Sequence, residues 1–273
     1  MMSRFNAKHL ILGLSLSVFF SCKKDDNPSP TPPPQEEPTL FEKVQGRWDA
    51  AVDLPPRTSS SSVSYKNQEM LRVRSIEFLS DSTYIVAFAH GGAFTGKLSV
   101  VDSASFNFAG FGKVSDIQIK NDSISFACSY NNVPLNVKAG KVSDLSISAD
   151  QKAILKSWVL TKEEDGADMY EEFNVEEGEK ITMLFSSAGT LLTKYGDEAT
   201  SRNWKWHPQK ANAALFYSPW QTEFNYDVYY KLAELTNTSL KIQLVHIEKE
   251  YDENENVTGT EEVVDKTYML SAK

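Results

Sequence analysis

The chain is poor in the residues that most often carry chemistry. It has two cysteines and four histidines among 273 residues. The histidines, at positions 9, 90, 207 and 246, have no close spacing, so the sequence predicts no metal site. Basic residues are also few, since 28 lysines and arginines stand against 37 aspartates and glutamates. This acidic balance argues against nucleic acid as a partner, because nucleic-acid binding depends on cationic side chains.

The apolar run near the N-terminus is too short to span a bilayer. It extends from Leu10 to Phe20 and follows Arg4 and Lys8. A run of about eleven residues covers only ~16 Å as a helix, roughly half of a bilayer core. A basic segment, a short apolar run and a small residue, in that order, predict a secretory signal peptide over residues 1–21.

The residues that end this segment, Phe19-Phe20-Ser21-Cys22, resemble the lipobox of bacterial lipoproteins, in a variant found in Bacteroidota. The resemblance implies that Cys22 is acylated and becomes the first residue of the mature protein. It also implies a lipid-anchored protein of the outer membrane, on the cell surface or the periplasmic face. The alternative is an ordinary thiol near a cleaved signal peptide.

A proline-rich segment follows Cys22, and we predict that residues 22–39 form a disordered tether. Six prolines lie between Lys23 and Thr39, with almost no apolar side chain that could be buried. A chain of this kind advances ~3.1 Å per residue, so the tether could hold a folded body up to ~50 Å from the lipid. Its first residues, Lys23-Lys24-Asp25-Asp26, resemble a short signal for the outer cell surface; the alternative is a solvated charge cluster.

The body that follows the tether contains an internal repeat. Thr39-Leu40-Phe41-Glu42 and Ser148-Ala149-Asp150-Gln151 each have the spacing of a helix capping box. We expect a short helix after each box, the second over Ala149 to Lys156, leading to Trp48 and Trp158 respectively. The two tryptophans are about 110 residues apart, which is the size of one small domain.

We therefore predict two β domains, over residues 40–147 and 148–273. Apolar residues alternate at period two in almost every segment, as in Tyr84, Val86 and Phe88. Many such strands joined by turn residues indicate an all-β antiparallel meander. The strands must close into barrels or stack as β-sandwiches, because open edges invite aggregation. Alternation alone leaves both possibilities open.

A resemblance favours barrels. Gly46-Arg47-Trp48, after a short helix, resembles the glycine-any-tryptophan signature at the start of lipocalins and related calycins. Residues 152–273 resemble the lipocalin-like domains of Bacteroidota lipoproteins, including the strand Asn203-Trp204-Lys205-Trp206. The resemblance implies two tandem antiparallel meander barrels, each with a tryptophan closing its floor.

Aromatic residues provide the candidate ligand site. Four of them, Trp204, Trp206, Tyr226 and Tyr230, crowd the second domain, and aromatic side chains offer large contact areas. His246 falls at period two with Leu240, Ile242 and Leu244, so we expect it to point inward with them. These five residues could bind a small apolar or glycan ligand. The alternative is that the aromatic side chains simply fill the interior of a small barrel.

Motifs for catalysis are missing from the sequence. No serine lies in a nucleophile elbow and no glycine-rich phosphate loop occurs, so we predict a protein that is not an enzyme and has no cofactor. Asp252 begins a sequence like a calcium loop, but Val257 replaces its required glycine, which predicts a polar hairpin tip. The sequence favours a membrane-anchored, non-enzymatic interaction or structural module of the cell envelope, with an envelope protein as partner. The alternative is a binding protein for a small apolar or glycan ligand in the second barrel.

Overall fold

The computed structural model describes residues 38–52, 72–130, 133–164, 175–176, 178–218 and 221–273. The predicted signal peptide, Cys22 and most of the tether therefore lie outside the described residues. Pro38–Lys273 form one compact unit, within which two closed sheets follow one another along the chain. In the described part of the chain, no helix has the length and apolar character needed to cross a membrane.

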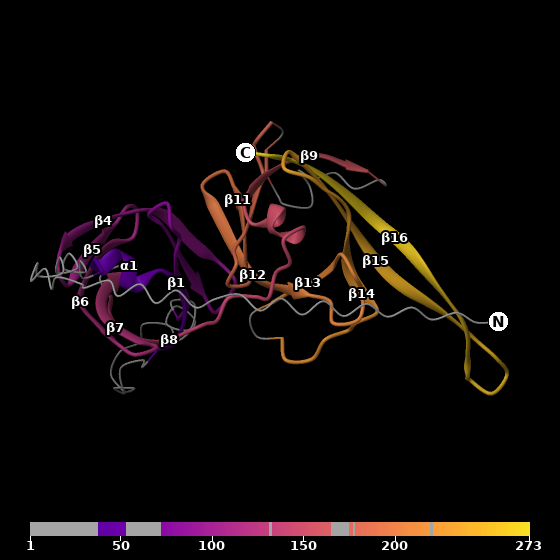
Figure 1. Ribbon diagram of the computed structural model, residues 1–273, viewed down its shortest axis with the longest axis horizontal. Helices are drawn as coiled ribbons and strands as arrows, with labels where there is room; N and C mark the ends of the chain where they lie inside the picture. Colours follow the sequence, from indigo (N-terminus) through magenta and orange to yellow (C-terminus); the bar gives the residue numbers. More distant parts are fainter. Residues whose placement is uncertain (1–37, 53–71, 131–132, 165–174, 177, 219–220) are drawn as a thin grey trace, which may run out of the picture. The chain divides into compact units, whose positions relative to one another are not determined.

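The first sheet is an eight-stranded antiparallel meander that closes into a barrel (Figure 1). It is preceded by α1 (Leu40–Val44), and the predicted capping box is confirmed: Glu42 N donates to the Thr39 hydroxyl, and Thr39 N donates to the Glu42 carboxylate. The barrel closes because β1 pairs with both β2 and β8. Its strands are β1 (Gly46–Val52), β2 (Val73–Phe78), β3 (Thr83–Phe88), β4 (Ala93–Asp102), β5 (Ser105–Phe108), β6 (Gly112–Lys120), β7 (Ser123–Tyr130) and β8 (Val133–Lys141).

The second sheet is also an eight-stranded antiparallel meander, and it closes into a ring because β9 pairs with both β10 and β16. The predicted all-β architecture is thus confirmed, with closed sheets and not sandwiches. The strands of the ring are β9 (Ser157–Glu164), β10 (Thr182–Phe185), β11 (Thr190–Tyr195), β12 (Glu198–Trp206), β13 (Ala213–Tyr217), β14 (Val228–Leu235), β15 (Ser239–Tyr251) and β16 (Val257–Ala272).

The helix expected before the second sheet is wrong in type and length. In place of an α-helix over Ala149 to Lys156 there is a four-residue 3-10 helix, η1 (Gln151–Ile154). Ser148 does not cap it, because its hydroxyl bonds to the Asp150 carboxylate. Without a side-chain cap on its backbone amides, the turn does not extend into an α-helix.

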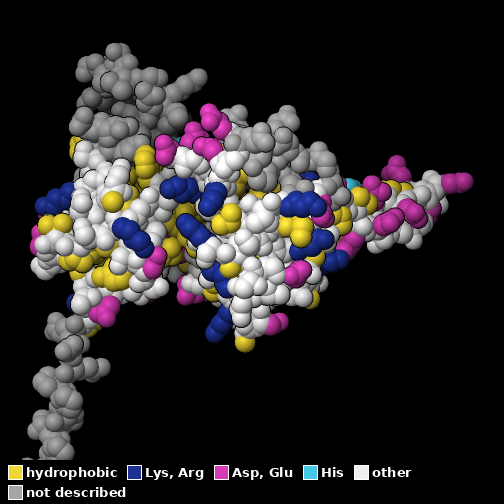
Figure 2. Space-filling model, turned by 90° about the horizontal axis from the view of Figure 1, so that it is seen from above, with side chains coloured by type: hydrophobic (Ala, Val, Ile, Leu, Met, Phe, Trp, Pro, Cys, Tyr) yellow, Lys and Arg dark blue, Asp and Glu magenta, His cyan; other side chains and the backbone are white. Residues whose placement is uncertain are grey.

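The β15–β16 hairpin is the longest element of the second sheet, with strands of 13 and 16 residues (Figure 1). Beyond Ile247 and Glu262, the paired residues of the two strands have no third strand beside them among the described residues. This part, residues 248–261, is called the hairpin arm below. Figure 2 shows acidic side chains along it. At its tip the Asp252 carboxylate accepts hydrogen bonds from the backbone N–H groups of Asn254 and Asn256, both at 2.8 Å, so the predicted polar tip is confirmed.

The two tryptophans of the repeat occupy equivalent places. Trp48 Nε1 donates to the carbonyl oxygen of Val44 at 2.7 Å, and Trp158 Nε1 donates to that of Ile154 at 3.0 Å. In both cases the acceptor lies four residues earlier, at the end of the short helix. Both indoles are fully buried. Each tryptophan therefore fixes a short helix against the first strand of its sheet, as the repeat predicts.

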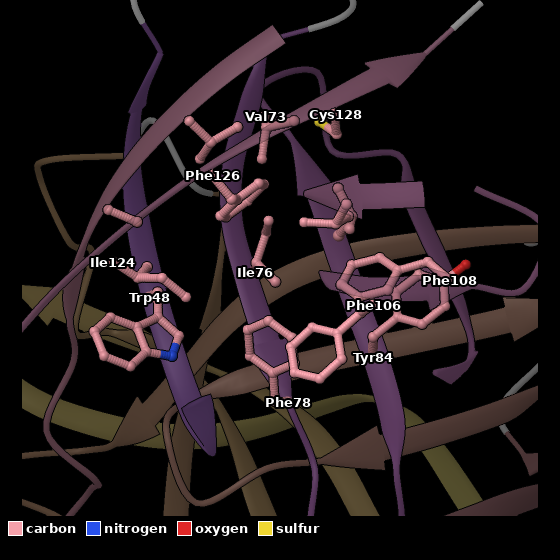
Figure 3. Close-up of a cluster of buried hydrophobic side chains, with 14 of the residues drawn as sticks. Trp48, Val73, Ile76, Phe78, Tyr84, Phe106, Phe108, Ile124, Phe126 and Cys128 are labelled. Carbon is pink, nitrogen blue, oxygen red and sulfur yellow. The ribbon is translucent and has the colours of Figure 1, made fainter. Parts of the chain in front are cut away.

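The interior of the first barrel is filled by aromatic side chains (Figure 3). Tyr84 stacks on Phe108 with ring centroids 4.3 Å apart, and Phe78 contacts both Phe106 and Phe108 at 5.9 Å. Cys128 belongs to the same cluster and is buried as a small hydrophobic side chain. A core of this kind holds the barrel together by burial of apolar area, and it leaves the interior occupied.

Candidate functional site

The strands β2 and β3 are buried on both of their faces. Alternation directs Ile76, Phe78, Tyr84 and their neighbours into the barrel, yet the outward-facing residues of these strands are also covered. Ser75, Glu77, Ile85 and Ala87 are each no more than 4% exposed. Neither Ile85 nor Ala87 belongs to the core cluster of the barrel, so a second layer of protein must cover them.

That layer is the second sheet. Gly92 and Thr200 form an antiparallel bridge, and the N–H of Ser201 donates to the carbonyl oxygen of Gly91 at 2.7 Å. The Arg74 guanidinium lies 3.4 Å from the side-chain oxygen of Asn203, which is itself buried. The two sheets thus meet through backbone and side-chain polar contacts.

Arg47 lies directly beside Glu77, since the two residues are partners in the β1–β2 register. Its guanidinium is 4% exposed and donates to the Asp49 carboxylate at 2.8 Å. Across the junction it lies 3.4 Å from both the carbonyl oxygen of Gly189 and the hydroxyl of Thr190. Arg47 therefore links the first strand of the barrel to the turn between β10 and β11.

The Glu77 carboxyl is the most unusual group at this junction. It is 3% exposed, and burial raises its pKa above the ordinary value of 4.5. Hydrogen bonds from the Thr190 and Ser186 hydroxyls and the nearby charge of Arg47 act in the opposite direction, but burial outweighs them. Its Oε2 atom is buried without a hydrogen-bond partner among the described residues. An unpaired polar atom in this position costs free energy unless something binds it.

A groove of 1270 Å³ opens at the junction, and Glu77 lines it. One wall comes from the β2–β3 turn and from β4, where Thr95, Gly96 and Lys97 contribute. The other wall comes from β9 to β11, where Leu155, Ser157, Thr182 and Leu192 contribute. The groove is thus a concave surface built by both sheets, with a buried carboxyl at its side.

The aromatic residues predicted as a ligand site are only partly brought together. Trp204 and Trp206 lie with ring centroids 5.2 Å apart, and Trp204 Nε1 donates to the carbonyl oxygen of Ser186 at 3.1 Å. Tyr230 packs against the same cluster in the second sheet and stacks on Phe216 at 4.0 Å. Three of the five predicted residues therefore share one interior region.

The other two predicted residues lie elsewhere. Tyr226 precedes β14, is 40% exposed, and has its ring 5.6 Å from that of His207. His246 lies on the same face of β15 as Leu244, because it pairs with Val228 while Leu244 pairs with Tyr230. Its side chain is nevertheless 32% exposed, and its ring nitrogens lie 2.9 Å from Asp265 and 3.4 Å from Glu248. The β15–β16 register shifts between Leu244 and Val245, and the extra residue is Asp265 on β16, so the alternation of β15 itself continues.

Glu77 was missed by the sequence analysis, although the sequence contains a signal for it. Glu77 interrupts an otherwise apolar strand end, Ile76-Glu77-Phe78, and the neighbouring run from Tyr84 to Phe88 is wholly apolar. A continuous apolar run indicates a strand covered on both faces, so an acid in the adjacent strand would be buried. In the described part of the chain, no group of three histidine, cysteine or acidic residues could hold a metal ion.

Comparison of the chain with protein-family models, with curated protein sequences and with solved structures found no match.

Proposed function

We propose that the chain is an outer-membrane lipoprotein, anchored through an acylated Cys22, whose body is a non-enzymatic interaction module of the cell envelope. The lipobox-like sequence before Cys22 and the proline-rich tether after it support the anchor. We further propose that both closed sheets are lipocalin-like domains. Their antiparallel meander order, and the short helix and buried tryptophan before each sheet, support this assignment.

The hairpin arm is the observation that carries the interaction proposal. Tyr251 and Val257 lie on it and are 59% and 51% exposed, although most apolar side chains of the strands are buried. The arm contains six acidic side chains and one lysine, Lys249, which pairs with Asp227. A two-stranded ribbon is only marginally stable alone, and its edges can pair with another chain. We therefore propose a protein partner that covers these apolar residues and presents basic side chains to the acids.

A photo-crosslinking residue in place of Tyr251 tests the arm. We expect it to capture a specific envelope protein in intact cells, and we expect the yield to fall at high salt because acidic-basic contacts are screened. The same residue in place of Val101, which is 54% exposed on the first barrel, is the matched control. Equal labelling from both positions, or none from Tyr251, would contradict the proposal.

The anchor is tested by Cys22→Ala. Each buried CH₂ of an acyl chain contributes ~0.8 kcal/mol to membrane binding, so loss of acylation should release the protein from the membrane fraction. The measurement is fractionation after metabolic labelling with palmitate. Undiminished label on the Cys22→Ala protein would exclude acylation at this residue.

A small apolar or glycan ligand in the second sheet is the second candidate, and one atom favours it. Trp206 Nε1 is buried without a hydrogen-bond partner among the described residues, beside Trp204 and near the clustered Tyr230. A ligand acceptor there would satisfy it. We expect such a ligand to quench tryptophan emission and to raise thermal stability with its free concentration. If a screen of fatty acids, sterols, haem and oligosaccharides produced neither effect, these aromatic side chains would have a packing role only.

A further inference from the structure

We propose that the groove at the junction of the two sheets binds a neutral, hydroxyl-rich ligand of the oligosaccharide class, with Glu77 as its buried hydrogen-bonding group. This inference is independent of the proposed contact through the hairpin arm, because different residues carry it. Three properties of the groove support it: its charge balance, its hydroxyl groups and the unpaired atom of Glu77.

The charges around the groove cancel. Four acidic residues line it, at positions 77, 81, 122 and 144, and four lysines line it, at positions 97, 141, 194 and 273. Lys97 and Asp81 already neutralise one another, with Nζ and Oδ2 2.7 Å apart. A charged ligand would therefore meet as much repulsion as attraction, whereas a neutral ligand avoids the larger cost of removing a charge from water.

Hydroxyl groups are frequent on both walls. Eight serine and threonine side chains line the groove, among them Thr95 on one wall and Thr182 and Ser157 on the other. Each hydroxyl can donate and accept a hydrogen bond, which suits the hydroxyl groups of a sugar. Leu155, Leu184 and Leu192 lie between them and provide apolar contact for the C–H faces of the rings.

Glu77 distinguishes this groove from an ordinary gap between two sheets. Its carboxyl is almost fully buried in the groove wall, and its Oε2 atom has no hydrogen-bond partner among the described residues. A ligand hydroxyl that donates to Oε2 would relieve this cost. A purely apolar ligand such as a hydrocarbon chain would leave the atom unpaired in a drier environment, so its binding is disfavoured.

Calorimetric titration of the purified full chain tests the ligand class. The neutral probes are maltohexaose, cellohexaose, xylohexaose and chitohexaose, and the charged comparators are hexagalacturonate and hexalysine. We expect at least one neutral hexasaccharide to bind with a Kd of about 1 mM or lower, and to bind more tightly than either charged oligomer. The absence of binding by all four neutral probes would overturn the proposal, and so would tighter binding of a charged one.

Variants of the groove locate the binding. We expect Glu77→Leu to weaken binding about tenfold or more, while Glu77→Gln, which keeps a polar acceptor, stays within about threefold of the native Kd. Near-UV circular dichroism checks that both variants fold. Should Glu77→Leu not fold, the pair Thr95→Val and Thr182→Val removes one hydroxyl from each wall, with Thr260→Val on the hairpin arm as control. Native affinity in a folded Glu77→Leu variant, or in the paired threonine variant where Glu77→Leu does not fold, would overturn the proposal.

Discussion

The two sheets of this protein begin alike and end differently. Each starts with a short helix whose last carbonyl accepts a hydrogen bond from a buried tryptophan. Each tryptophan also has a lysine over its ring: Lys141 Nζ is 5.1 Å from the centroid of Trp48, and Lys156 Nζ is 5.3 Å from that of Trp158. The lysines come from different places, since Lys141 ends β8 and Lys156 precedes β9, so the shared part of the repeat is the packing that starts each sheet.

The sheets differ in their interiors and in their longest strands. The first barrel has strands of at most 10 residues and an interior filled with phenylalanine. The second sheet has the 13- and 16-residue strands that form the hairpin arm, and tryptophan and tyrosine are prominent in its cluster. One closed meander thus keeps its strands around its own core, while its counterpart extends two strands beyond it.

Replacement of the two repeat tryptophans should have the largest effect on stability. Trp48→Ala and Trp158→Ala each leave a large cavity and remove an indole hydrogen bond, so we expect each to cost about 3–5 kcal/mol of unfolding free energy. Denaturant unfolding measures this. If residues 40–147 and 148–273 are separate domains, Trp48→Ala should shift the unfolding transition of the first and Trp158→Ala that of the second. A single transition that both variants shift would contradict this division.

Glu77 should make the junction between the sheets sensitive to pH. Because its folded pKa is raised above 4.5, the stability that it contributes is fully present below pH 4.5 and is lost as pH rises through the folded pKa. The Glu77→Gln variant does not lose this stability, because glutamine cannot ionise. The unfolding free energy of the variant minus that of the native protein should therefore increase as pH rises. Denaturant melts across that pH range provide the measurement, and a difference that stays constant with pH would exclude an ionisable Glu77 at the junction.

Substitutions at the helix caps should have a smaller effect on the unfolding free energy, and the effect should differ between the two sheets. Thr39 caps α1 in a full capping box, so Thr39→Ala should cost about 1 kcal/mol. Ser148 makes no cap to η1, and Ser148→Ala should change the unfolding free energy by less than about 0.5 kcal/mol. Equal costs for the two variants would mean that Ser148 caps the second helix in solution.

The smallest expected effect is at His246 on β15. A hydrogen bond to Asp265 is the main cause that raises the pKa of this imidazole above 6.5, and Glu248 adds to it. Asp265→Asn should therefore lower the pKa of His246 towards 6.5, and Glu248→Gln should lower it less. Titration of the His246 ring signals by NMR measures both changes. An unshifted pKa in Asp265→Asn would place the imidazole in another environment.

Much of the fold could be predicted from the sequence, because strand periodicity and capping are local. The meanders, the helix after Thr39 and the placement of the two tryptophans follow from such local patterns. The shift between Leu244 and Val245 could not be predicted, since a register irregularity depends on the partner strand and leaves no mark in the alternation of β15. Asp265 is the extra residue of this shift, so its contact with His246 could not be predicted either.

The candidate groove was beyond sequence reasoning for a different reason. Alternation says which side chains of a strand face the core, but it does not say whether the opposite face meets water or another sheet. Ser75 and Glu77 have the polarity of surface residues, and only contact with the second sheet makes them buried. The groove is a product of that contact, so no single segment of the sequence encodes it.

Cys128 has a consequence for how the first barrel can be observed. Burial raises the pKa of its thiol to about 11, and the side chain is 8% exposed, so it should resist alkylating reagents while the barrel is closed. With Cys22 acylated or replaced, it is the sole thiol of the chain. The rate at which a reagent modifies the Cys128 thiol then measures how often the barrel opens. No label has to be introduced into the protein for this measurement.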